Sequence, residues 1–150
     1  MVNRIWTLSN KPIPFSDALK EEFSKRVNEL LKKTKKLARV SSRIHIHGGR
    51  IYFYYLSEAH LPENGIYVGK KLIDGKYQEW VFARITIYDR NGDHCTADWQ
   101  NSSLRWHVVH EGSLENCIQY IETDQWGFAP PDDRFAAIHD ILKEKDVRPE

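Results

Sequence analysis

A pair of glycines, Gly48-Gly49, separates two alternating segments, R-I-H-I-H and R-I-Y-F-Y, and constrains the fold of this chain more than any other feature. Both central residues of a two-residue type I′ hairpin need positive φ, which glycine adopts without steric cost. The turn predicts that His47 faces Arg50 and that Arg43 faces Tyr54. Because side chains alternate along a strand, one face of this hairpin is apolar and the other is basic and aromatic.

Later turn signals extend this hairpin into a meander. Asp74-Gly75 predicts a second hairpin between strands at residues 65–73 and 76–88. At residues 90–92 (R-N-G), a three-residue loop with Gly92 in the left-handed region keeps apolar residues on one face and sets Arg84 opposite Asp98.

The last strand pair is predicted from a turn at residues 101–103 (N-S-S). Pairing Trp99 with Leu104 places Trp106 on the core face and Arg105 opposite Asp98. Asp98 would then lie between arginines of both neighbouring strands, in cross-strand pairs that contribute about 0.2–1 kcal/mol each.

Helical patterns flank the predicted strands. From Asp17 to about Ala38, apolar residues recur at helical spacing after Ser16, a good N-cap. Ser113 caps a short helix, and a last helix begins at Asp132 or Asp133 and carries Phe135, Ile138, Ile141 and Leu142. We expect an α+β fold in a single domain over residues 1–150. Its antiparallel sheet of five to six strands in meander order has a long N-terminal helix and one or two C-terminal helices.

The charge of the chain is balanced overall but uneven along it. A net charge of +1, from 22 basic and 21 acidic residues, does not indicate a globally basic nucleic-acid binder. Nine basic residues nevertheless lie between Lys25 and Arg50 against one acid, Glu29. This stretch is either a solvated helix face or a contact for nucleic acid.

The cysteine content and hydropathy indicate the cellular location of the protein. Two cysteines without a C-x-x-C pair make no disulfide framework. The N-terminus lacks an apolar signal region, and no stretch of 18 apolar residues occurs. These features predict a soluble cytoplasmic protein without a membrane partner.

The basic and aromatic face of the sheet is the candidate binding site. Cations interleaved with aromatic rings can hold phosphates and stack bases. We therefore expect a non-catalytic binding or accessory protein that contacts an anionic partner, which is a nucleic acid, a nucleotide or an acidic protein surface. The candidate binding residues are Arg43, His45, His47, Arg50, Tyr52, Tyr54, Arg84 and Arg105.

Three other interpretations stay open. His45 and His47 point the same way and could bind a metal, but two arginines and no carboxylate beside them disfavour a dication; a solvated strand face is the plainest interpretation. A small hydrolase or nuclease would use His45, His47 or an Asp98–His107 pair, with or without a metal. A protein–protein adaptor or a homodimer would use the edge strands. Since common catalytic motifs are absent, no catalytic residue, metal or cofactor is assigned.

Four segments carry a resemblance: R-I-H-I-H-G-G-R-I-Y-F, V-F-A-R-I-T-I-Y, L-R-W-H-V-V and S-L-E-N-C-I-Q-Y-I-E-T-D-Q-W-G-F. Their order between residues 16 and 129 resembles a family of small bacterial domains of unknown function. That family has one helix, a short antiparallel meander and a closing helix with an aromatic-glycine tail. The insertion around residues 60–78 and the extra C-terminal helix depart from it. The resemblance implies a fold but no activity and no site residues.

Overall fold

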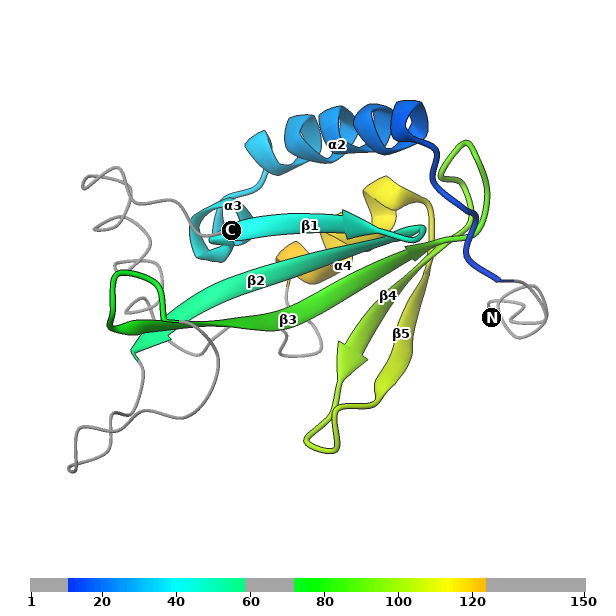
Figure 1. Ribbon diagram of the computed structural model, residues 1–150. Helices are drawn as coiled ribbons and strands as arrows, with labels where there is room; N and C mark the ends of the chain where they lie inside the picture. Colours follow the sequence, from blue (N-terminus) through cyan, green and yellow to red (C-terminus); the bar gives the residue numbers. More distant parts are fainter. Residues whose placement is uncertain (1–10, 59–71, 124–150) are drawn as a thin grey trace.

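The protein folds as an α+β structure whose sheet is an antiparallel meander in the order β1-β2-β3-β4-β5 (Figure 1). This computed structural model describes residues 11–58 and 72–123. The strands are β1 (Arg43–His47), β2 (Arg50–Glu58), β3 (Tyr77–Ile87), β4 (Cys95–Gln100) and β5 (Trp106–Gly112). Three helices, α2 (Asp17–Lys32), α3 (Lys36–Val40) and α4 (Leu114–Thr123), pack on one face of the sheet. The predicted fold class is confirmed.

Two predicted elements fall outside the described residues. They are most of the strand at residues 65–73 and the last helix, which begins at Asp132 or Asp133. No helix within residues 11–58 and 72–123 combines the length and the apolar character needed to cross a membrane.

The long N-terminal helix begins as predicted but ends early. Ser16 caps it, and its side chain accepts a hydrogen bond from the backbone N–H of Leu19 at 3.1 Å. The prediction of one helix to Ala38 is wrong, because α2 stops at Lys32 and α3 starts anew at Lys36. The carboxylate of Glu122 in α4 accepts three backbone N–H bonds at this break, from Lys35, Lys36 and Leu37, at 2.7, 3.2 and 2.7 Å.

The registers of β1 with β2 and of β3 with β4 follow the sequence prediction, whereas β3 pairs with β2 in a register that was not predicted. His47 faces Arg50, and the pairing continues to Arg43 and Tyr54. Gly48 and Gly49 both have positive φ, at 59° and 77°. The three-residue turn before β4 is confirmed too, with Gly92 at φ 73° and Arg84 opposite Asp98.

The predicted register of β4 with β5 is wrong. Asp98 faces Val108 rather than Arg105, and a bulge shifts the register between Ala97 and Asp98. The turn is made by residues 102–104, with Leu104 in the left-handed region at φ 63°. Asn101 stabilises this turn, because its side-chain oxygen accepts hydrogen bonds from the backbone N–H groups of Ser103 and Arg105 at 2.9 and 3.0 Å.

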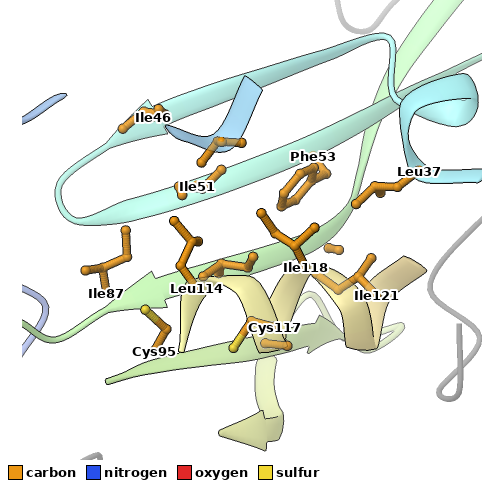
Figure 2. Packing of buried hydrophobic residues seen from close by; sticks show 14 of the residues in the cluster. Leu37, Ile46, Ile51, Phe53, Ile87, Cys95, Leu114, Cys117, Ile118 and Ile121 are labelled. Atoms are coloured by element: carbon orange, nitrogen blue, oxygen red, sulfur yellow. The ribbon is translucent and has the colours of Figure 1, made fainter. Parts of the chain in front are cut away.

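The main core lies between the sheet and the helices, where apolar residues of β1–β4 meet α4 (Figure 2). Cys95 and Cys117 are both buried in it and carry free thiols. Burial raises the pKa of each thiol well above its usual range. The two side chains therefore pack as small apolar groups.

One arginine joins three parts of this helix layer. The Arg26 guanidinium of α2 donates to a side-chain oxygen of Glu115 in α4 from Nε and Nη2, at 3.1 and 2.6 Å. Its Nη1 donates to the backbone oxygen of Asn91 in the β3–β4 turn at 2.6 Å. The two helices and the turn are thus held together at one point.

Candidate ligand-binding surface

The face of the sheet opposite the three helices, here called the outer face, carries a row of four rings. His47 and His45 of β1 stack with centroids 6.0 Å apart, and His45 lies 6.3 Å from Tyr52 of β2. Tyr52 in turn lies 6.2 Å from Trp106 of β5. The row therefore runs from the β1 edge of the sheet to β5.

The contact between Tyr52 and Trp106 depends on the shape of the sheet. Two strands lie between β2 and β5, which corresponds to about 14 Å in a flat sheet with strands about 4.8 Å apart. The register shifts in β2–β3 and β4–β5 are sites where a sheet bends and twists more strongly. Figure 1 shows the β4–β5 hairpin turned away from β1 and β2. Tyr52 and Trp106 can therefore lean toward each other over the strands between them.

A buried ion pair lies beneath these two rings. Nε of Arg84 donates to Asp98 Oδ2 at 2.8 Å, and the guanidinium stacks 4.4 Å from the Trp106 ring centroid. Asp98 is only 1% exposed and also accepts hydrogen bonds from the hydroxyls of Thr86 and Thr96, at 2.6 and 2.7 Å. Four strong contacts thus hold the centre of the outer face in one arrangement.

A second ion pair lies further along the outer face. Arg43 donates to the carboxylate of Glu79 in β3, with its Nη2 2.7 Å from Oε1, and stacks 4.3 Å from the Tyr54 ring centroid. The hydrogen bond to Glu79 is the main cause that raises the pKa of Arg43. Burial raises the pKa of the Tyr54 phenol. Glu79 therefore neutralises one of the predicted cations.

Arg50 is placed differently from the two paired arginines. It is half-buried, and its strand partners are His47 on β1 and Thr86 on β3. It forms no ion pair within residues 11–58 and 72–123. Its buried Nε has no hydrogen-bond partner among the same residues. A buried donor without a partner costs about 1–3 kcal/mol, so this group gains from an added acceptor.

The histidines at the edge of the row are exposed. Burial lowers the pKa of His45, and the charge of Arg43 and the neighbouring His47 lower it further. His45 therefore gains its charge at a lower pH than an ordinary histidine does. In the described part of the chain, His, Cys, Asp and Glu side chains nowhere gather in threes as a metal site needs.

Seven of the eight predicted binding residues lie on the outer face, and Arg105 does not join them. Trp106 points to the outer face, so alternation puts Arg105 and His107 on the other side. The interpretation that Asp98 and His107 form an acid–base pair is therefore wrong. His107 faces Trp99, and its Nε2 lies 2.8 Å from the side-chain nitrogen of Asn101. The acid–base interpretation loses its geometric basis.

Sequence reasoning missed two residues of this surface. Trp106 was assigned to the core through the wrong register of β5. Glu79 lies 36 residues from Arg43 and reaches it only across the β2–β3 bulge. In the sequence, the acidic side chain of Glu79 within the predicted strand at residues 76–88 was the signal that could have indicated a partner for Arg43.

Comparisons of the chain with protein-family models, with curated proteins and with solved structures gave no match. The resemblance to small bacterial domains therefore stays a prediction from the sequence.

Proposed function

We propose that this protein is a non-catalytic binding protein for single-stranded nucleic acid, which it contacts through the ring row of the outer face. The observation that supports the proposal is the continuous row of His47, His45, Tyr52 and Trp106, with neighbouring centroids 6.0–6.3 Å apart. Aromatic side chains on a sheet stack successive bases without regard to sequence. The cytoplasmic location predicted from the two cysteines is part of this proposal.

The charges of the outer face favour stacking over phosphate contacts as the source of affinity. Arg43 and Arg84 are held by Glu79 and Asp98, so Arg50 is the arginine left for a phosphate. For single strands, log K falls with log salt by about 0.7 per neutralised phosphate. One such contact gives an expected slope of about −0.7, which is shallow. An acidic protein surface would offer no bases, and its binding would not depend on Trp106.

Replacing Trp106 by alanine is expected to weaken binding of a labelled single-stranded oligonucleotide strongly. Stacking of one base on an aromatic side chain contributes about 1–3 kcal/mol, which corresponds to about 5–150-fold in Kd. Fluorescence anisotropy with oligo(dT) and with an RNA of mixed sequence measures the loss. His107→Ala is the matched control, because His107 is the next residue on the same strand and lies on the other face. Unchanged affinity in a folded Trp106→Ala protein would contradict the proposal.

Binding is also expected to strengthen as the pH falls below about 6.5, the usual histidine pKa. The free protein holds the pKa of His45 below that value, so protonation of this side chain adds a positive charge to the row in this range. A bound anion raises the same pKa, and the two effects are reciprocal. Anisotropy titrations at pH 7.5, 6.5 and 5.5 and constant ionic strength test this. The pH dependence should diminish in His45→Gln and persist in His107→Gln; a flat wild-type profile would place His45 outside the contact.

A further inference from the structure

A groove of about 360 Å³ lies beside β1, away from the ring row. It is formed where the C-terminal half of α2 and the short helix α3 approach the first strand. Its lining is mainly apolar, through Leu31, Ala38 and Ile44, with polar groups at the rim. The lining residues are Asn28, Leu31, Lys32, Ala38, Ser41, Arg43 and Ile44.

The strand that borders this groove is an edge of the sheet. In a two-residue hairpin the closing pair, His47 and Arg50, is hydrogen-bonded, and every second pair after it is bonded too. The backbone groups of Ile44 and Ile46 therefore point away from β2. Within residues 11–58 and 72–123 they have no backbone partner, so β1 can accept a further strand.

A polar side chain in the groove also lacks a partner. Ser41 is only 8% exposed, and its Oγ forms no hydrogen bond with any described residue. Its backbone N–H is already satisfied by the carbonyl of Leu37 at 3.0 Å. Buried hydroxyls are almost always paired, so this one indicates a site that a ligand group completes.

The surroundings of the groove are basic. Lys32, Lys33, Lys35, Lys36 and Arg39 cluster where α2 ends and α3 begins. Lys33 and Lys35 are exposed, and neither forms an ion pair with another described residue. On the outer side of β1, Arg43 is already paired with Glu79, so the positive charge offered to a partner comes from Lys33 and Lys35. A partner with acidic side chains is therefore favoured here.

We propose that β1 and this groove bind an extended acidic segment of another protein as an additional strand. Backbone hydrogen bonds to Ile44 and Ile46 hold the segment, and alternate side chains decide its identity. An apolar side chain on the helix side enters the groove beside Leu31 and Ala38. Its neighbours in the sequence point to the outer face, where Asp or Glu can accept hydrogen bonds from the exposed imidazoles of His45 and His47.

A second copy of the chain fits this edge poorly. Antiparallel pairing of β1 with its own copy sets the basic and histidine side chains of R-I-H-I-H against one another. The copy has no acidic side chain on this strand, so it offers none of the charge complementarity that Lys33 and Lys35 favour. The acidic segment of a different protein supplies it.

The test uses a labelled peptide with capped ends in which glutamate alternates with valine. We expect saturable binding that Ala38→Phe weakens at least tenfold, because the new ring fills the groove. Gln119→Phe, which places the same ring on an exposed position of α4, should bind as wild type does. A peptide with lysine in place of glutamate should not bind. Equal binding by Ala38→Phe, or by the lysine peptide, would overturn the proposal.

Two further readouts separate this site from a general electrostatic contact. Peptide should slow hydrogen exchange at the amides of Ile44 and Ile46. Ser41→Ala should weaken peptide binding while leaving thermal stability equal or higher, because it removes a buried hydroxyl without a partner. Protection of both amides without peptide, together with a dimer mass in sedimentation, would assign the edge to a second copy and overturn the proposal.

The two proposals can fail independently. Trp106→Ala should leave peptide binding unchanged, and Ala38→Phe should leave oligonucleotide binding unchanged.

Discussion

Replacing Asp98 by alanine is expected to lower the free energy of unfolding by about 3–5 kcal/mol, the range measured when one partner of a buried ion pair is removed. The carboxylate is almost fully buried and accepts bonds from Arg84, Thr86 and Thr96. Its loss leaves a half-buried guanidinium uncompensated and two buried hydroxyls without their acceptor. Urea denaturation followed by circular dichroism measures the change.

Two other variants give this experiment its controls. Asp98→Asn keeps the size and one acceptor oxygen, so its loss of stability should be smaller than that of Asp98→Ala. Asp93→Ala removes an exposed carboxylate beside the β3–β4 turn and should change stability by no more than about 0.5 kcal/mol. If Asp98→Ala behaved like Asp93→Ala, the network beneath Trp106 would not be buried in solution.

Alanine at Gly49 is expected to destabilise the fold by about 2–5 kcal/mol. The left-handed backbone costs a residue with a Cβ about 1–2 kcal/mol, and overpacking adds about 1–3 kcal/mol. A Cβ built at Gly49, at φ 77°, would lie 2.3 Å from the backbone oxygen of Ile13 and 3.0 Å from Cβ of Pro12. The Gly49 carbonyl also accepts a bond from the backbone N–H of Ile87 at 2.9 Å, so the turn cannot move away freely.

The neighbouring glycine is a matched control for this effect. Gly48 has φ 59°, yet a Cβ there would meet no atom within 4 Å. Gly48→Ala should therefore show the backbone cost alone, about 1–2 kcal/mol. Differential scanning calorimetry of both variants measures the steric part as the difference between them. Equal losses would mean that residues 12 and 13 do not cover the turn in solution.

Local signals explain which parts of the sheet could be predicted. The turns at Gly48-Gly49 and Gly92 have glycine where positive φ is needed, so their registers followed from the sequence. The last turn has leucine in that position, and a leucine there is rare because of its Cβ. Its geometry depends on the side chain of Asn101, and no residue type near Asp98 indicates the bulge there.

Long-range contacts explain the remaining differences. The break between α2 and α3 contains neither glycine nor proline, and it is fixed by Glu122, which lies 85 to 87 residues away in the sequence. The candidate surface could likewise be predicted only where local pattern decides it. Side-chain alternation in the first hairpin correctly predicted that His45, His47 and Tyr52 share one face, whereas Trp106 joins them only through the observed register of β5.

The meander has a consequence for the order in which the protein folds. Each strand pairs with its neighbour in the sequence, so the sheet can grow hairpin by hairpin. Three of these steps close a short loop, and the step from β2 to β3 closes the longer segment 59–76. The link from Arg26 to Glu115 instead joins residues 89 apart. Contacts of such long separation carry a larger entropy cost and tend to form after local ones. We therefore expect the junction of α2 with α4 to form late and to close the core.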